Sequence, residues 1–195
     1  MRKEFAFHLD LKKVSSEINI FFILSILWTL IIFYFSIQPA SVSRKQSGEI
    51  LVKAKIISED EIQPENQEAS RAGYIFHAQN LIRKTAHLIE YFVLGLLICC
   101  GFLRNMLHKK LKKDIYIKDI YIKKNIICGL NTLWICILVA ACDEFIQKFI
   151  PGRGPGLKDV LIDTAGTASG ITIVLIVNLL LYYIKGSTHK LKTKG

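Results

Sequence analysis

The chain has 195 residues, of which 51% are hydrophobic, and it carries a formal charge of +10 from 26 Lys and Arg against 16 Asp and Glu. This length suits one domain, and five cysteines with four prolines exclude a disulfide-stapled scaffold and a disordered or fibrous chain. The hydrophobic residues are clustered in runs, so the choice lies between a soluble helical domain and a membrane protein. The positive charge by itself would suggest nucleic acid, but the sequence contains no nucleic-acid-binding motif.

The first hydrophobic run, residues 18–37, contains twenty residues and no charge. About 20 apolar residues are needed to cross the hydrocarbon of a bilayer, so this run predicts a transmembrane helix. A cleavable signal peptide is the alternative, but its apolar core is shorter, about 7–15 residues, and the QPASVS that follows the run is a poor cleavage site. We therefore predict an uncleaved anchor.

Three further runs predict transmembrane helices at about 81–103, 126–146 and 160–184. The apolar part of the second run starts only at residue 88, so its helix must begin upstream among charged residues. The predicted fold class is therefore all-α: a polytopic membrane protein whose four transmembrane helices form a membrane domain over residues 18–184.

The basic residues predict the orientation of this bundle. With the N-terminus in the cytoplasm, four helices return the C-terminus to the same side, and sixteen of the 26 Lys and Arg residues become cytoplasmic. Lys and Arg are enriched in cytoplasmic loops, so this N-in/C-in topology is favoured, although Arg83 and Lys84 then lie on the outer side. The basic segments 1–17 and 185–195 are predicted to be cytoplasmic and to contact anionic lipid.

The connections differ in character. Residues 38–80 form an outer segment with the acidic patch SEDEIQPENQE, and within it 47–57 has the spacing of an amphipathic helix, either on the membrane surface or as a cap on the bundle. Residues 104–124 contain the near-duplicate KDIYIKDIYIKK, which we interpret as a basic juxtamembrane stretch. The PGRGPGLKD segment at 151–159 separates helices three and four, and a re-entrant Pro/Gly loop is one option there.

Ionisable residues inside the predicted helices gather at their outer ends. In the second helix, Arg83, His87 and Glu90 are spaced i, i+4 and i+7, which places them on one helix face. The outer ends of the third and fourth helices carry a similar set: Asp143, Glu144, Gln147, Asp159 and Asp163. A charge at the centre of a membrane helix costs about 2.5–3.5 kcal/mol, so such residues tend to face one another or a water-filled cavity and to be functional.

The same pattern also allows a purely structural interpretation, in which these charged residues form an interhelical network that sets helix register. Gly166 and Gly170 have the small-xxx-small spacing that is typical of close helix packing. Asp159 would act as the N-cap of the fourth helix. Its side chain would then satisfy the free N–H groups of the first turn, which could otherwise bind an anion beside Arg153.

A metal site would draw on four residues of this set: His87, Glu90, Asp143 and Asp163. Only one histidine is well placed and no HExxH motif occurs, so we predict no metal and no cofactor. No serine lies in a GxSxG context, so nucleophilic catalysis has no candidate.

Three stretches of this sequence resemble the VanZ-like family of membrane proteins: FSIQPASVSRKQS, RKTAHLIEYFVLG and DEFIQKFIPGRGPGLKDVLIDTAGTASGI. The last stretch is the most specific, and the resemblance covers about residues 20–184. It implies a multi-pass protein of the bacterial cytoplasmic membrane. The family takes its name from a member that raises resistance to teicoplanin, a lipoglycopeptide that acts on the outer side of the membrane.

Two functions from different classes follow. In the first, which we favour, the protein is not an enzyme: an outer-leaflet polar pocket binds an amphiphile, a lipid head group, a cell-wall precursor or the glycopeptide, and so lowers susceptibility to teicoplanin. In the second, it is a membrane-embedded enzyme that acts on a lipid-linked phosphate or cell-wall precursor. The candidate catalytic residues are His87, Glu90, Asp143 and Glu144. The candidate ligand-binding residues are Lys84, Gln147, Arg153, Asp159 and Asp163.

Overall fold

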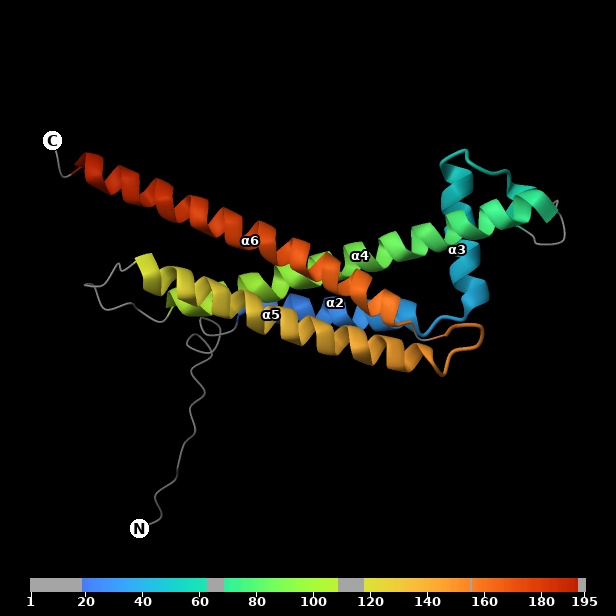
Figure 1. Ribbon diagram of the computed structural model, residues 1–195, viewed down its shortest axis with the longest axis horizontal. Helices are drawn as coiled ribbons and strands as arrows, with labels where there is room; N and C mark the ends of the chain where they lie inside the picture. The colour runs from blue at the N-terminus through green and yellow to red at the C-terminus, as the bar shows by residue number, and fades with distance from the viewer. Residues whose placement is uncertain (1–18, 63–68, 109–117, 155, 193–195) are drawn as a thin grey trace, which may run out of the picture.

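The computed structural model describes residues 19–62, 69–108, 118–154 and 156–192, and this part of the chain consists of helices and turns. In chain order the elements are α2 (Ile20–Ser36), α3 (Ala40–Lys53), the short 3-10 helix η1 (Glu59–Ile62), α4 (Ala69–His108), α5 (Lys118–Gln147) and α6 (Leu157–Lys192). In Figure 1, α2, α4, α5 and α6 run along the bundle, and α3 lies across one end. The start of α2 and the end of α6 lie at the other end, which is compatible with the predicted N-in/C-in topology. The basic segment 1–17 lies outside the described residues.

The helices have the length and composition of membrane spans. Three of them qualify, over Arg71–Met106, Tyr121–Gln147 and Leu157–Ile184, and the bent pair of α2 and α3 adds a fourth if it is taken as one span. Many large apolar side chains face outward from these helices, as on a surface that contacts lipid. The predicted all-α polytopic membrane fold is therefore confirmed, with three or four candidate spans.

A buried asparagine fixes the beginning of α2. The side-chain oxygen of Asn19 accepts a hydrogen bond from the backbone N–H of Phe21, as an N-cap does. The amide nitrogen of Asn19 donates to the Gly101 carbonyl at 2.6 Å and to Asn105 Oδ1 at 2.9 Å. The first turn of α2 is thereby attached to α4.

A sharp bend of 103° separates α2 from α3. The sequence predicted an amphipathic helix over 47–57, whereas α3 spans Ala40–Lys53 and starts directly after Pro39. Its end is set by Lys55, whose φ of 58° is left-handed, with the Ile56 N–H bonded back to the Leu51 carbonyl. This is a Schellman termination on a residue other than glycine, so the sequence did not indicate it.

The α3 helix packs against the first half of α4. Leu51, Ile57 and Ile75 form a small buried cluster between them. The sequence left two placements open for this segment, the membrane surface and a cap on the bundle, and the structure shows that it packs on α4.

The long helices extend beyond the predicted spans. The α4 helix has 40 residues rather than the expected 81–103, about 60 Å at 1.5 Å per residue and about twice the hydrocarbon thickness. Hydropathy detects only the apolar part of such a helix. The helix is longer than that part because no helix-breaking residue separates it from its polar ends. For the same reason α5 begins at Lys118 and α6 continues to Lys192, in stretches that were expected to be connections or tail. Residues 63–68 and 109–117, which hold parts of the acidic patch and of KDIYIKDIYIKK, lie outside the described residues.

The α4 and α6 helices cross with their backbones in contact. A Cβ atom built on Gly166 would lie 2.3 Å from the carbonyl oxygen of Leu88, and one on Gly170 would lie 2.4 Å from that of Phe92. From the opposite side, a Cβ on Gly95 would lie 2.8 Å from the Thr167 carbonyl oxygen. The small-xxx-small spacing therefore serves close helix packing here, as the sequence indicated.

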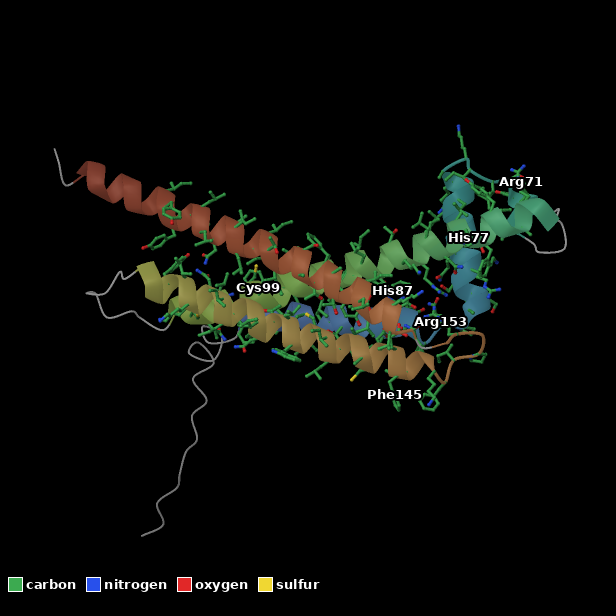
Figure 2. The ribbon with its side chains drawn as sticks, viewed as in Figure 1. Arg71, His77, His87, Cys99, Phe145 and Arg153 are labelled. Carbon is green, nitrogen blue, oxygen red and sulfur yellow. The ribbon has the colours of Figure 1, made fainter. Side chains whose placement is uncertain are left out.

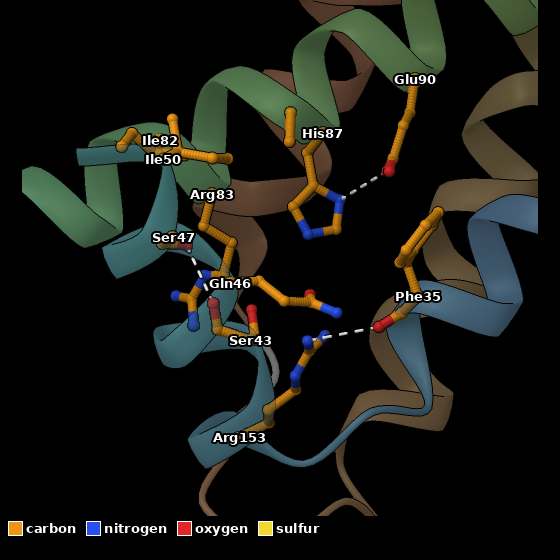
Figure 3. Close-up of a pocket in the computed structure, with 11 residues that line it drawn as sticks. Phe35, Ser43, Gln46, Ser47, Ile50, Ile82, Arg83, His87, Glu90 and Arg153 are labelled. Carbon is orange, nitrogen blue, oxygen red and sulfur yellow. Dashed lines mark hydrogen bonds and ion pairs between the residues drawn. The ribbon is translucent and has the colours of Figure 1, made fainter. Parts of the chain in front are cut away.

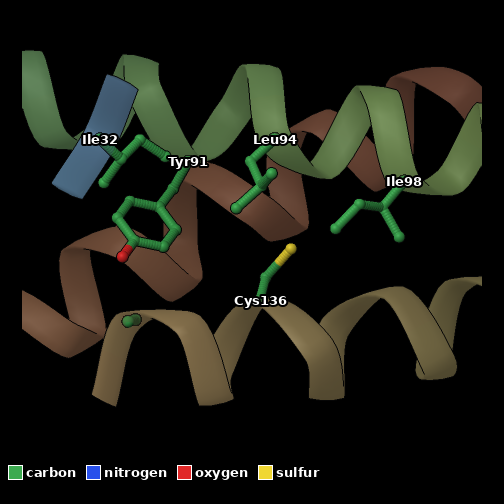
Figure 4. Close-up of a cluster of buried hydrophobic side chains, with 6 residues drawn as sticks. Ile32, Tyr91, Leu94, Ile98 and Cys136 are labelled. Atoms are coloured by element: carbon green, nitrogen blue, oxygen red, sulfur yellow. The ribbon is translucent and has the colours of Figure 1, made fainter. Parts of the chain in front are cut away.

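The main hydrophobic core lies where α2, α4 and α5 meet (Figure 4). Its buried members are Ile32, Tyr91, Leu94, Ile98, Cys136 and Ala140. Three successive turns of α4 supply Tyr91, Leu94 and Ile98, so this face of α4 is the centre of the bundle. All five cysteines are free, and Cys136 packs here as a small apolar side chain.

We expect Gly170→Ala to lower the thermal unfolding midpoint of the purified protein, because the new methyl group has no room beside Phe92 and the helices must separate. Gly73→Ala is the matched control on α4, since a Cβ there meets no atom within 4 Å. An alanine in an exposed helix position gains up to about 1 kcal/mol over glycine, so the control midpoint should stay or rise. Equal shifts in both variants would contradict the close crossing.

Candidate functional site

The polar residues predicted from helical spacing meet where α4, α5 and α6 converge, next to the bend between α2 and α3 (Figure 2). From α4, His87 points between two carboxylates: its Nδ1 lies 3.7 Å from Glu90 Oε2 and 3.8 Å from Asp163 Oδ1. These separations are longer than hydrogen bonds. His87 is therefore close to both acids without being bonded to either.

The two aspartates of the cluster are fully enclosed. Asp143 on α5 and Asp163 on α6 are both 0% exposed. One oxygen of Asp143, Oδ2, accepts a hydrogen bond from Gln147 Nε2 at 3.2 Å, and the same nitrogen donates to Ser36 Oγ at 2.8 Å. The other Asp143 oxygen and both Asp163 oxygens have no hydrogen-bond partner among the described residues.

Glu144 serves the loop between α5 and α6. Its Oε2 accepts a hydrogen bond from the Gly156 N–H at 2.8 Å. The loop also turns at Gly152, whose φ of 73° suits glycine, and the Pro151 carbonyl accepts a hydrogen bond from the Ala40 N–H. Glu144 thus shapes the loop that carries Arg153, and it is engaged by the backbone rather than by the rest of the acidic cluster.

Arg153 occupies the end of α2. Its two terminal nitrogens donate to the Ser36 carbonyl at 3.1 Å and the Phe35 carbonyl at 3.4 Å. A cation is favourable at a helix C-terminus, where carbonyl groups lack partners. Burial, and after it the charge of Arg83, lowers the pKa of the Arg153 guanidinium, but arginine stays charged at any physiological pH.

Two cavities open beside this cluster. The smaller one, about 210 Å³, lies between α3 and α4, and Figure 3 shows Arg83, His87, Glu90 and Arg153 in its wall. The larger one, about 790 Å³, also includes Arg83 and Arg153 among its lining residues. The two arginines therefore line both cavities.

The larger cavity collects most of the predicted ligand-binding residues: Lys84, Gln147, Arg153 and Asp159. Asp163 lies instead in the buried acidic cluster. The expectation that Asp159 is an N-cap is wrong: α6 begins at Leu157, and the Gly156 carbonyl accepts the first bonds of the helix. Asp159 lies in the first turn, where its negative charge is still favourable.

Some participants were not among the predicted site residues. Arg83 lies on the same stripe as His87, and that stripe was the signal that could have selected it. Ser36 and the α3 residues of the smaller cavity, Ser43, Gln46 and Ser47, could not have been placed because the bend between α2 and α3 was not predicted.

A comparison with protein-family models matches residues 21–178 to the VanZ/LLP1 family. The chain belongs to the VanZ/LLP1 family. The matched range includes every candidate residue of the site, and it confirms the resemblance found in the three sequence stretches. No curated protein and no solved structure matches the chain.

The role of Glu144 in this VanZ/LLP1 protein can be tested by hydrogen–deuterium exchange of residues 148–156. We expect Glu144→Ala to speed exchange of the loop amides about tenfold or more, because a hydrogen bond to a charged acceptor contributes about 1.5–3 kcal/mol. Glu144→Gln keeps a side-chain acceptor for the Gly156 N–H and should change exchange much less. Similar exchange in the wild type and the alanine variant would show that the contact does not hold the loop.

Proposed function

We propose that this protein binds the phosphate-bearing head group of a lipid in the two cavities lined by Arg83 and Arg153. The observation that carries the proposal is an excess of unpaired cations. The larger cavity is lined by five cationic side chains and a single carboxylate, Asp159; the cations are Arg44, Arg83, Lys84, Arg153 and Lys158. Among the described residues, none of the five has a recorded ion pair.

The chemistry of the lining groups favours phosphate. Arginine presents a planar fork of donors that matches phosphate oxygens, and lysine adds a mobile point charge. Apolar side chains at the cavity walls, Phe35, Ile50 and Ile82 in the smaller and Phe76 and Leu157 in the larger, suit the lipid portion next to the head group. An amphiphile with a phosphate therefore fits better than a free anion.

The residues that line the cavities come largely from α3, the part of α4 beside it and the loop before α6. These segments lie at the end of the bundle opposite the start of α2 and the end of α6 (Figure 1). With the predicted N-in/C-in topology in a bacterial cytoplasmic membrane, this end belongs to the outer leaflet. A lipid head group or cell-wall precursor bound there is withheld from, or presented differently to, a glycopeptide such as teicoplanin. This is how we propose that the protein lowers susceptibility to such drugs.

One observation favours a second candidate, an enzyme that acts on a lipid-linked phosphate. His87 and Glu90 line the smaller cavity together with the two arginines, so a proton-transfer group would lie beside the bound phosphate. In this alternative His87 or Glu90 is the general base, and Asp143 is a better acid than Glu144, which holds the loop. If the wild type turns over a lipid phosphate and a folded Glu90→Gln variant does not, the protein is an enzyme. If the wild type shows no turnover and Glu90→Gln only weakens binding by degrees, the binding protein is favoured.

The binding proposal is tested with the full chain in nanodiscs and a phosphatidic acid or polyprenyl phosphate titration. We expect Arg83→Gln to weaken binding at least tenfold, because it removes one of the two cations that line both cavities. Arg71→Gln is the matched control on the same helix, since Arg71 pairs with Glu61 and lines neither cavity. Equal affinity in both variants would refute the assignment of the pocket.

The link to glycopeptides is tested by the inhibitory concentration of teicoplanin in a sensitive Gram-positive host. We expect the wild type to raise this concentration several-fold and Glu90→Gln, Asp143→Asn and Arg153→Ala to lose the effect at equal membrane abundance. Absence of protection by the wild type would remove teicoplanin from the proposal and leave the head-group pocket to the binding assay.

A further inference from the structure

We propose that His87, Asp143 and Asp163 form a binding site for one divalent transition-metal ion. Each residue comes from a different helix, α4, α5 and α6, and offers one ligand atom; these three atoms all lie within 4.8 Å of one another. The sequence argued against a metal because a single histidine and no short ligand motif were visible. A site assembled from three helices leaves no such motif, so the spatial arrangement decides.

The buried atoms of this cluster point to a ligand that is missing from their surroundings. Asp143 and Asp163 are both 0% exposed, and the atoms without a hydrogen-bond partner are Asp143 Oδ1, both carboxylate oxygens of Asp163, and His87 Nδ1. Buried polar groups almost always have partners, because leaving one unpaired costs the full loss of its hydration. Three of the four carboxylate oxygens of these two buried acids therefore lack a partner among the described residues, which a cation between them would explain best.

Arg153, which lies next to this cluster, does not fill this role. Arg153 is bonded to the carbonyl groups at the end of α2, and no ion pair joins it to either aspartate. Gln147 donates to Asp143 Oδ2 and leaves Oδ1 free, which is how an outer-shell partner orients a ligating carboxylate.

The donor set indicates the class of metal. Two carboxylate oxygens and one imidazole nitrogen suit Zn²⁺ or Mn²⁺, whereas Mg²⁺ and Ca²⁺ prefer oxygen alone. Zinc binds such ligands at about 2.0–2.2 Å, so in a tetrahedral site the ligand atoms lie about 3.4 Å apart. The three side chains have to converge by roughly an ångström, a motion within the reach of their terminal torsions.

A three-ligand site keeps one position open, as catalytic zinc sites do. His87 also lines the smaller cavity together with Arg83 and Arg153, so the metal site and this cavity share a wall. A phosphate bound in that cavity could reach an open position on the metal from this shared wall. This last step rests on the proposed lipid binding, whereas the metal site itself does not.

The test is isothermal titration of the chelator-treated, detergent-solubilised full chain with Zn²⁺ alone and with Mn²⁺ alone. We expect one ion per chain, and at least tenfold weaker binding in Asp163→Asn and in His87→Gln. His77→Gln is the matched control, since His77 lies on the same helix as His87 but outside the cluster, and this variant should bind as the wild type does.

Thermal unfolding with and without metal distinguishes a metal site from a purely structural role of these three residues. Zn²⁺ should raise the unfolding midpoint of the wild type and leave that of Asp163→Asn unchanged, because a ligand stabilises only the state that binds it. Without metal, Asp163→Asn should be at least as stable as the wild type, since it removes an unpaired buried acid. Wild-type binding no tighter than that of Asp163→Asn, or no midpoint shift with either ion, would overturn the metal site and assign the cluster to neutral carboxyl groups. Retained Zn²⁺ binding in Arg83→Gln separates this proposal from the lipid pocket.

Discussion

The backbone contact between α4 and α6 is the constraint on which the rest of the site depends. Gly166 and Gly170 let α6 lie directly on the carbonyl groups of Leu88 and Phe92. His87 is the residue before Leu88, and Asp163 lies one turn before Gly166. Because both side chains start from backbones in contact, the crossing point sets the separation of their polar atoms, 3.8 Å between His87 Nδ1 and Asp163 Oδ1. A larger residue at either glycine would move the helices apart and open the acidic cluster. The two glycines therefore determine both the packing of α4 on α6 and the geometry of the acidic cluster.

The second determinant is the bend after α2. The bend ends α2 at Ser36. The carbonyl groups of Phe35 and Ser36 at this end then accept hydrogen bonds from Arg153. The same turn places Ser36 Oγ within reach of Gln147, which in turn orients Asp143. The loop between α5 and α6 is held from both sides, by Glu144 and by the contact of Pro151 with Ala40. Arg153 therefore has a fixed location between the buried acids and the open cavities, which a flexible Gly-rich loop alone would not provide.

Helical spacing was enough to predict which polar residues share a face and that the faces meet. His87 and Glu90, Asp143 and Gln147, and Asp159 and Asp163 were selected on that basis, and the structure brings His87, Asp143 and Asp163 within a few ångströms. Spacing could not predict the bend at 37–39 or the end of α3 at Lys55. Both depend on backbone conformations that these residue types do not indicate, such as the positive φ of Lys55. Spacing also could not show which acids have hydrogen-bond partners. Glu144 accepts a hydrogen bond from the Gly156 N–H, whereas Asp163 accepts none from the residues that the structure describes.

The site divides into two halves of opposite charge that do not neutralise each other. The acidic half lies around the buried Asp143 and Asp163, and the basic half, around Arg83 and Arg153, lines the two cavities. Within the part of the chain that the structure describes, no Lys or Arg forms an ion pair with either aspartate, and no acid forms one with either arginine. Opposite charges this close would normally form ion pairs, since each pair would lower the cost of burial. Their separation is understandable if each half is completed by something from outside: a divalent cation on the acidic side and a phosphate on the basic side. His87 belongs to the acidic cluster and also lines the smaller cavity beside Glu90 and the two arginines, so the two halves adjoin at His87.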